Sequence, residues 1–311
     1  MFQGAFTAMI TPFKDGRVDF DRLTEHVRFQ LDGGIDGLVP VGTTGESPTL
    51  SHEEHRAVIE HVVNKARELT SAGGANNKRG KGKAKSGAGR KVQVIAGTGS
   101  NSTEEALELT EHAKRVGADG ALMVNPYYNK PTQEGLYRHF MFIADRVDLP
   151  IILYNIPGRC GVQMNAATVA RLAKHPNIVC IKEATGSMDM ASEIRSLCDI
   201  GILSGDDSLT LPLMSIGGGG VISVLSNLLP AQVKALVDAA AAGNYTQARK
   251  LHKELFHLCK VMFIETNPIP IKTAMALVGR DTGELRLPLC EMSTENKATL
   301  EKTLRTRGVL K

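Results

Sequence analysis

Short hydrophobic runs alternate along the chain with longer stretches in which apolar residues recur every three or four positions. The short runs are rich in Val, Ile and Leu and are bounded by Gly, Pro or Asn, a pattern that is typical of buried strands. They predict eight strands: Gly4–Ile10, Gly37–Val41, Val92–Ala96, Gly120–Val124, Pro150–Ile156, Ile178–Glu183, Gly201–Gly205 and Gly220–Leu225.

The longer stretches predict amphipathic helices between the strands. Several begin with residues that cap helices, notably Ser51 with Glu54 three positions later. These helices are Asp19–Leu31, Ser51–Leu69, Thr103–Val116, Thr132–Arg146, Asn165–Lys174, Ser187–Leu197 and Ser208–Ile216. Four more follow the last strand: Pro230–Ala242, Tyr245–Ile264, Pro268–Val278 and Thr294–Arg305.

Strands without polar alternation, each followed by a helix, indicate a parallel sheet that is covered by helices. Eight such units predict an α/β protein with a (β/α)8 TIM barrel over residues 1–226. The surplus helices predict a small C-terminal helical domain over residues 227–311, and such an addition often supports assembly. An open doubly wound sheet is the alternative, but no Gly-x-Gly-x-x-Gly turn follows the first strand.

Residues 70–91 break this pattern. They are rich in Gly, Ser, Asn, Ala and Lys, and they hold seven positive charges and no acid. Without those charges the formal net charge falls from +4 to −3, so the basic balance belongs to this segment alone. The composition predicts a flexible insertion between a helix and a strand, on the face away from the carboxyl ends of the strands. A tether for nucleic acid is the alternative, but the segment has no aromatic residues.

Composition excludes several classes of protein. At 311 residues, with 42% hydrophobic and 23% charged residues, the chain can bury a full core. Its five cysteines are odd in number and form no Cys-x-x-Cys pair, which favours reduced thiols in a cytoplasmic protein. No N-terminal leader and no run of membrane-spanning length are present, so we expect neither secretion nor a membrane.

Lys182 is the strongest candidate for chemistry. It lies near the end of the predicted strand Ile178–Glu183, where an unpaired ammonium is costly to bury and tends to lose its proton. A neutral amine attacks carbonyl carbons and forms a Schiff base. Pairing with Glu183 is the plain alternative, but strand alternation directs the two side chains to opposite faces.

Other candidates follow other strands, where a TIM barrel carries its active site. The turn Gly42–Ser47 offers hydroxyls and free N–H groups that suit a carboxylate, without the spacing of a P-loop. Tyr154 is predicted to point inward beside Lys182, and Arg159 can take a carboxylate in bidentate fashion. Asp206 and Asp207 are read as a helix start, and the histidines form no metal-ligand cluster, which argues against a metal-dependent aldolase.

Four of these motifs resemble the family of pyruvate-dependent class I aldolases and lyases that includes dihydrodipicolinate synthase and N-acetylneuraminate lyase. The resemblance runs from Gly4 to about Gly279 and is carried by Gly42–Ser47, Tyr127–Asn129, Tyr154–Pro157 and Ile181–Gly186. It implies that Lys182 forms a Schiff base with pyruvate and that Thr44 holds the pyruvate carboxylate, with no cofactor and no metal. It also implies a proton relay of Tyr154, Thr43 and Tyr128, the last from a neighbouring subunit of a homotetramer (a dimer of dimers), and substrate contacts at Gly205 and Ile222.

Arg159 distinguishes branches of this family. The resemblance implies that it binds the carboxylate of L-aspartate 4-semialdehyde, which favours the synthase that leads to diaminopimelate and lysine. A sugar-acid or other 2-keto acid lyase that uses the same lysine is the alternative, and a non-catalytic sensor of small acids is a third. Pro48, Cys160 and the basic insertion depart from the family pattern.

The resemblance also implies a regulatory site for L-lysine as an inhibitor, in which a carboxylate receives the ligand's ammonium. Tyr127 is bonded directly to the relay residue Tyr128, which gives a short covalent route between the two sites. The plain alternative for the two histidines is an exposed first helical turn. The site residues are Ser47, Pro48, His52, His55, Asn101, Glu105 and Tyr127.

Overall fold

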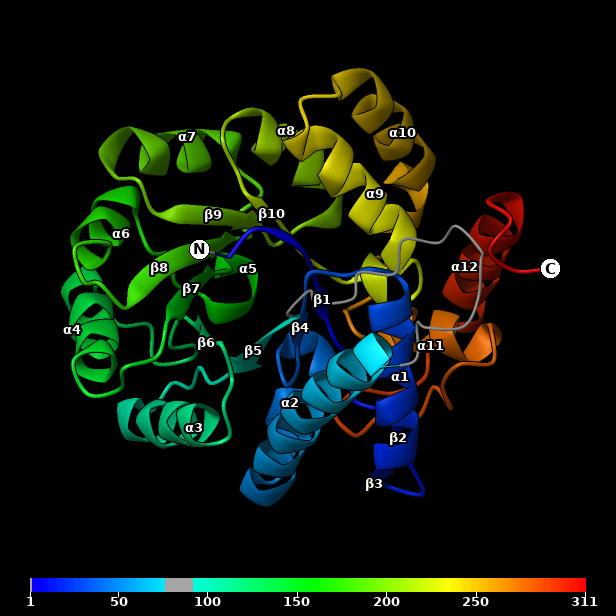
Figure 1. Ribbon diagram of the computed structural model, residues 1–311, viewed down its shortest axis with the longest axis horizontal. Helices are drawn as coiled ribbons and strands as arrows, with labels where there is room; N and C mark the ends of the chain where they lie inside the picture. Colours follow the sequence, from blue (N-terminus) through cyan, green and yellow to red (C-terminus); the bar gives the residue numbers. More distant parts are fainter. Residues whose placement is uncertain (1, 76–91) are drawn as a thin grey trace.

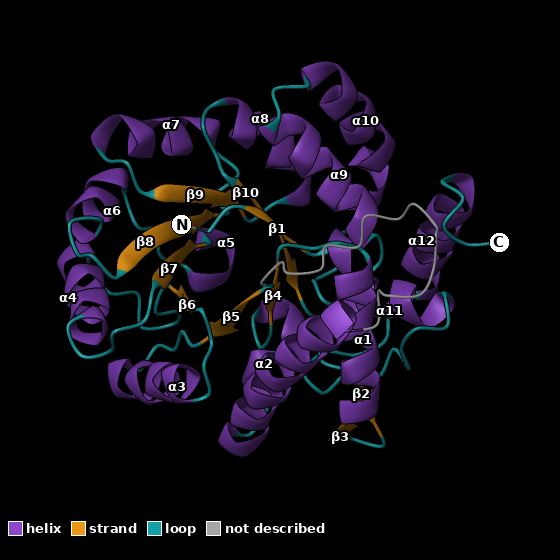
Figure 2. Cartoon of the chain, viewed as in Figure 1, coloured by secondary structure: helices purple, strands orange, loops and turns teal. Residues whose placement is uncertain are grey.

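Eight parallel strands close into a barrel at the centre of the molecule (Figures 1 and 2). The structure is a computed structural model that describes residues 2–75 and 92–311. All eight predicted strands are confirmed, with ends within two residues of the expected ones. The strands are β1 (Gly4–Ala8), β4 (Gly37–Val39), β5 (Gln93–Gly97), β6 (Gly120–Val124), β7 (Ile151–Asn155), β8 (Ile178–Glu183), β9 (Gly201–Ser204) and β10 (Gly220–Ser223).

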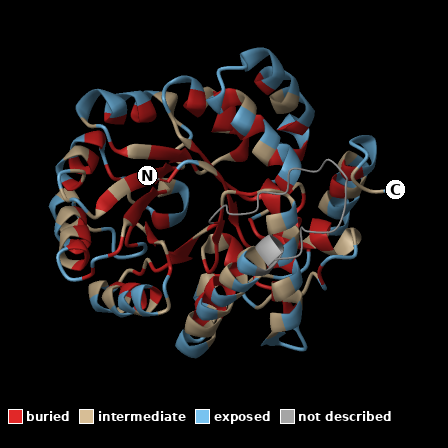
Figure 3. Cartoon of the chain, in the orientation of Figure 1, coloured by how far each residue is buried: buried red, intermediate tan, exposed pale blue. Residues whose placement is uncertain are grey.

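Each strand pairs with its neighbours in the chain, and β10 closes the ring against β1. The predicted (β/α)8 barrel is therefore confirmed. One set of side chains fills its interior, among them Phe6, Ile152 and Ile222, while a larger core lies between the strands and the helices. Figure 3 shows this arrangement as buried strands inside a ring of helices whose outer faces are exposed.

The predicted helices between the strands are present, with one split. The stretch Ser208–Ile216 forms a 3-10 turn, η3 (Asp207–Leu209), before α8 (Thr210–Ser215). The others are α1 (Phe20–Asp32), α2 (His52–Ala75), α3 (Thr103–Arg115), α4 (Gln133–Ala144), α6 (Ala166–Leu172) and α7 (Met188–Leu197). The predicted Ser51 capping box is formed, because the Glu54 N–H donates to Ser51 Oγ and the Ser51 N–H donates to Glu54.

The start of the predicted insertion is wrong. Helix α2 continues through residues 70–75, because extending a helix that is already formed is easier than nucleating a new one, even though Gly73 and Gly74 are poor helix formers. Within this helix the Thr70 hydroxyl donates back to the Ala66 carbonyl, four residues earlier, at 2.7 Å. The rest of the insertion, 76–91, lies outside the described residues.

Sequence patterning missed the shortest elements. These are the hairpin strands β2 (Phe13–Lys14) and β3 (Arg17–Val18), the single-turn helix α5 (Pro157–Cys160), and the 3-10 turns η1 (Thr43–Gly45), η2 (Ser47–Thr49) and η4 (Leu225–Asn227). Three of them lie in the segments after barrel strands that end at the candidate site: η1 and η2 come after β4, and α5 comes after β7. Their backbone is set by turn chemistry rather than by hydrophobic periodicity.

The C-terminal part of the chain is helical, as predicted. It contains α9 (Pro230–Ala241), α10 (Tyr245–Val261), α11 (Ile269–Leu277) and α12 (Thr294–Thr306), which gather along one side of the barrel in Figure 1. Helix α9 packs on β1 and β10 as well as on α10, so it covers the barrel like the other outer helices. The division at residues 226 and 227 stays a prediction. No helix in the described part is long and apolar enough to cross a membrane.

Candidate active site

Lys182 lies inside the barrel at the carboxyl end of β8. It points to the same face as Cys180, while Glu183 points outward and accepts a hydrogen bond from the Thr185 N–H at 2.6 Å, as the strand alternation predicts. The Lys182 side chain is 5% exposed, and no carboxylate among the described residues lies within ion-pair distance of its Nζ. Burial lowers the pKa of Lys182 to about 7; the Asp207 carboxylate opposes this shift and Arg159 adds to it.

Tyr154 stands beside Lys182 on the neighbouring strand. The two residues are register partners of β7 and β8, and Lys182 Nζ lies 4.1 Å from the centroid of the phenol ring. Burial raises the pKa of Tyr154 to about 12, against smaller opposing effects of Arg159 and of a hydrogen bond with Thr43. The phenol therefore keeps its proton at neutral pH and is linked through Thr43 to the first turn after β4.

That turn brings Thr43 and Thr44 to the mouth of the barrel. Thr44 is buried, and its Oγ1 accepts a hydrogen bond from Asn267 Nδ2 at 3.0 Å. The turn is anchored by Glu46, which adopts a left-handed conformation with φ of 54° and pairs with the buried Lys272 at 2.6 Å. The backbone that presents the two hydroxyls is thus fixed by a buried ion pair.

Arg159 lies on α5, just after β7. Its backbone position follows from Pro157 at the first turn of α5, where proline is favoured, and its Nη2 donates to the Asn267 carbonyl at 3.0 Å. Arg159 is exposed and lines a cavity together with Thr43 and Tyr154. It is close enough to influence the pKa values of both Lys182 and Tyr154. The remaining N–H groups of this guanidinium can bind a substrate carboxylate while Nη2 keeps its contact with Asn267.

Gly205 lies against the stem of Lys182, and Ile222 belongs to the side chains that fill the barrel interior. A Cβ added at Gly205 would come within 3.1 Å of Lys182 Cε and 2.6 Å of Ala184 Cβ, so only glycine leaves the lysine room. Ile222 is fully buried in the interior cluster together with Tyr154 and Leu203. Gly205 therefore limits the space around the lysine stem.

Tyr128 is the one predicted catalytic residue that the single chain does not bring to the site. It is 89% exposed and adopts a left-handed backbone with φ of 70°. Its exposure is compatible with the implied contribution to a neighbouring subunit, which stays a prediction.

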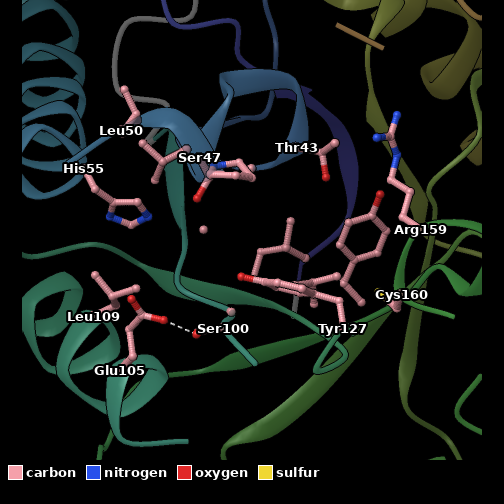
Figure 4. Close-up of a pocket in the computed structure, with 18 of the residues that line it drawn as sticks. Thr43, Ser47, Leu50, His55, Ser100, Glu105, Leu109, Tyr127, Arg159 and Cys160 are labelled. Carbon is pink, nitrogen blue, oxygen red and sulfur yellow. Dashed lines mark hydrogen bonds between the residues drawn. The ribbon is translucent and has the colours of Figure 1, made fainter. Parts of the chain in front are cut away.

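Six of the seven predicted regulatory residues line one cavity of about 480 Å³, to which the turn after β4 also contributes. Figure 4 shows Glu105, Ser100 and His55 on one side of this cavity and Thr43, Arg159 and Cys160 on the other. Ser47, Pro48, His52 and Tyr127 also line it, whereas Asn101 does not. The two sets of predicted residues are therefore neighbours across a shared space.

Glu105 lies among the residues that are predicted to bind L-lysine. It accepts a short hydrogen bond from Ser100, and its Oε1 lies 3.3 Å from His52 Nε2. Burial raises the pKa of Tyr127, and the nearby Glu105 carboxylate raises it further. His55 is buried rather than exposed as the plain alternative would have it, and burial lowers its pKa to about 4, so it is neutral at physiological pH.

Three residues of the site were missed by sequence reasoning. Asn267 holds both Thr44 and Arg159, Lys272 anchors the turn through Glu46, and Asp207 acts on Lys182 and also accepts the N–H groups of Val224 and Leu225 at 2.9 and 3.0 Å. Lys272 carried a signal, because it is a lone charge in an otherwise apolar helix. Asp207 was interpreted only as part of a helix start.

Comparisons with known proteins agree with this geometry. The model of the dihydrodipicolinate synthetase family matches residues 1–79 and 75–307. A 4-hydroxy-tetrahydrodipicolinate synthase from Geotalea daltonii is 55% identical over 96% of this chain and 97% of its own length. The crystal structure of dihydrodipicolinate synthase from Aquifex aeolicus matches with a TM-score of 0.90 and 50% identity over 99% of each chain.

A further solved structure is that of the enzyme from Cyanidioschyzon merolae with lysine bound, which matches with a TM-score of 0.89 and 38% identity over 99% of each chain. The family motifs, the barrel and the buried lysine at the end of β8 therefore coincide in one molecule. This chain belongs to the dihydrodipicolinate synthetase family.

Proposed function

We propose that this chain catalyses the 4-hydroxy-tetrahydrodipicolinate synthase reaction, the condensation of pyruvate with L-aspartate 4-semialdehyde, through a Schiff base on Lys182. The observation that carries this function is the environment of Lys182. Its amine is buried, has no carboxylate partner among the described residues, and has a pKa of about 7, so a large fraction is neutral and nucleophilic at physiological pH.

The chemistry follows from the groups around the amine. Lys182 Nζ attacks the keto carbon of pyruvate, and the carbinolamine loses water to give the Schiff base. Loss of a methyl proton gives an enamine that attacks the aldehyde carbon. The amino group of the second substrate then closes the ring on the former keto carbon and releases Lys182. Each step moves a proton, and Tyr154 with Thr43 forms the hydrogen-bonded route for it, which Tyr128 of a neighbouring subunit completes.

The substrates' carboxylates are assigned to different groups. Thr44, in the turn after β4, holds the carboxylate of pyruvate, and Gly205 and Ile222 bound the space for its methyl group. Arg159 holds the carboxylate of the semialdehyde. A sugar-acid lyase that uses the same lysine is the alternative function. Arg159 argues against it, because the resemblance gives this arginine a role in the synthase and none in the sugar-acid lyases.

Trapping tests the central claim. Pyruvate with borohydride should add one reduced pyruvoyl group per chain, and peptide mass analysis should locate it on Lys182. An adduct on another lysine, or turnover without any adduct, would contradict the assignment. Pyruvate consumption with the semialdehyde, set against cleavage of N-acetylneuraminate, separates the synthase from the lyase.

The regulatory cavity supports feedback inhibition by L-lysine. The Glu105 carboxylate can receive the ligand's side-chain ammonium, and Tyr127 at the same cavity precedes the relay residue Tyr128. Binding that moves Tyr127 would disturb the relay without occupying the pyruvate site. The expected result is partial inhibition that excess pyruvate does not relieve.

Glu105→Thr should abolish this inhibition and leave uninhibited turnover nearly unchanged. Glu104→Thr is the matched control, because it removes the same charge from the exposed neighbouring position of α3. Full sensitivity of the Glu105 variant, or calorimetry without lysine binding at millimolar concentration, would rule out this site and leave the catalytic assignment intact.

The expected assembly is a homotetramer, a dimer of dimers. The proposed role of Tyr128 requires one neighbouring subunit, and therefore at least a dimer. Sedimentation should give a mass of about four chains. A monomer with full activity would show that Tyr128 is not needed from a neighbour. The protein is expected in the cytoplasm, where its five cysteines stay reduced.

A further inference from the structure

Asn267 connects the two substrate subsites. It lies between α10 and α11, is 5% exposed, and contacts the turn after β4 with its side chain and α5 with its main chain. Its Nδ2 donates to Thr44 Oγ1 at 3.0 Å, and its carbonyl accepts from Arg159 Nη2 at 3.0 Å. Asn267 thus contacts both Thr44, which is proposed to bind pyruvate, and Arg159, which is proposed to bind the second substrate.

The direction of the first hydrogen bond matters for pyruvate. Because Asn267 Nδ2 is the donor, Thr44 Oγ1 is the acceptor and the hydrogen of the Thr44 hydroxyl remains available. A carboxylate can only accept hydrogen bonds, so this free hydrogen is what Thr44 offers to pyruvate. The Asn267 Oδ1 is buried without a hydrogen-bond partner among the described residues, so the contact with Thr44 is what orients the amide.

We propose that Asn267 is a positioning residue for both subsites: its side chain sets the hydroxyl of Thr44 for pyruvate, and its carbonyl sets Arg159 for the second substrate. The inference rests on the proposed function of Thr44 and Arg159. It separates into two parts, because substitution of the side chain removes the first contact and keeps the second.

Asn267→Ala should therefore raise the KM for pyruvate roughly 3- to 10-fold, the usual effect of one lost hydrogen bond, and change the KM for the semialdehyde by less than about twofold. A merely structural residue would instead lower the thermal midpoint and affect both substrates alike. Equal changes in the two KM values would overturn the proposal.

Two backgrounds test whether Asn267 acts through Thr44. In Thr44→Ser the hydroxyl remains, so Asn267→Ala should have its full effect. In Thr44→Val the hydroxyl is gone at nearly constant shape, and the same change should add less than about twofold. If Asn267→Ala raises the KM for pyruvate in the Thr44→Val background by the same factor as in the unmodified protein, Asn267 does not act through Thr44.

Asn267→Asp tests the direction of the bond, because a carboxylate accepts the Thr44 hydrogen and turns it away from pyruvate. Its KM for pyruvate should exceed that of Asn267→Ala, and a value equal to that of the unmodified protein would overturn the donor assignment. Pyruvate binding is also read without the second substrate, from the pyruvate concentration that half-saturates borohydride trapping. If the unmodified protein is not trapped at Lys182, the proposed function fails; if it is trapped and the Asn267→Ala variant has the same half-saturation, only the present proposal fails.

Discussion

Two lysines in the described part of the chain are buried, and they differ in whether a carboxylate contacts the amine. Lys182 on β8 and Lys272 on α11 are 5% and 0% exposed, and each Nζ lies over an aromatic ring, 4.1 Å from Tyr154 and 4.2 Å from Phe13. Lys272 donates to Glu46 at 2.6 Å and to the Thr11 carbonyl at 2.9 Å. Lys182 has no such partner among the described residues.

The partner decides what burial does to a lysine. Burial lowers the pKa of both amines, but at Lys272 the contacting Glu46 carboxylate opposes the shift and holds the proton in an ion pair. At Lys182 the opposing carboxylate is Asp207, which makes no ion pair with it. Lys272 is therefore a fixed cation that anchors the turn carrying Thr43 and Thr44, whereas Lys182 has the environment that the proposed nucleophile requires.

The largest effect expected from this comparison is the loss of catalysis in Lys182→Met. Turnover should fall on the order of 10⁴-fold or more, because no second amine is positioned to form the Schiff base. The fold should remain, since the change removes a buried amine that lacks a partner. Steady-state turnover and the thermal midpoint measure the two outcomes.

Lys174→Met is the control for that experiment, because Lys174 is exposed at the end of α6 and should show neither change. Substantial activity in Lys182→Met would remove the distinction between the two buried lysines.

Lys272→Met should have the opposite profile and primarily reduce stability. It leaves the Glu46 carboxylate buried without its cation, which costs about 3–5 kcal/mol of unfolding free energy. Denaturant titration measures this loss. The double variant Lys272→Met with Glu46→Gln should recover part of it, because the uncompensated charge is then absent. A single variant as stable as the unmodified protein would show that the ion pair does not anchor the turn.

Sequence reasoning found Lys182 and missed Lys272 for a physical reason. A charge at a predicted inward position of a short buried strand conflicts with the period-2 pattern, and the conflict is visible within six residues. The partners of Lys272 and Asn267 come from distant parts of the chain; Thr44 is 223 residues from Asn267. No local pattern encodes such contacts, although the lone charge in α11 marked Lys272 as unusual.

The same distinction applies to the fold. The eight strands and the longer helices were predictable because each repeats a hydrophobic period over its whole length. The elements at the mouth of the barrel, η1, η2 and α5, are each a single turn and were not predicted. The composition of residues 70–75 indicated a loop, but α2 extends through them. Tyr128 shows a further limit, because a residue that serves a neighbouring subunit is identified by resemblance and not by the geometry of its own chain.

The pH dependence of adduct formation sharpens the comparison further. With a pKa of about 7, the neutral fraction of Lys182 falls as pH decreases through 7, and it falls about tenfold for each unit below pH 6. The initial rate of trapping with pyruvate should therefore level off above about pH 8 and drop roughly 100-fold at pH 5. Samples incubated at each pH are quenched into one borohydride buffer, so that only imine formation varies. A rate that keeps rising through pH 9 would indicate an amine with the ordinary pKa of lysine.

A third set of lysines supplies the smallest expected effect and the baseline for the other two. Residues 78–91 contain Lys78, Lys81, Lys83, Lys85 and Lys91, which the sequence predicts to have no catalytic part. The strand β5 begins at Gln93, just after this segment in the sequence, so the segment precedes the amino-terminal end of a strand, whereas the candidate site lies at the carboxyl ends. Replacing its seven Lys and Arg residues by Ser at constant length should change kcat and both KM values by less than about twofold, with the pyruvate adduct still on Lys182 alone. A large loss of turnover with an unchanged thermal midpoint would mean that these charges act on the active site. In that case, the burial of a lysine and the presence of a carboxylate partner would not be enough to predict its role in this chain.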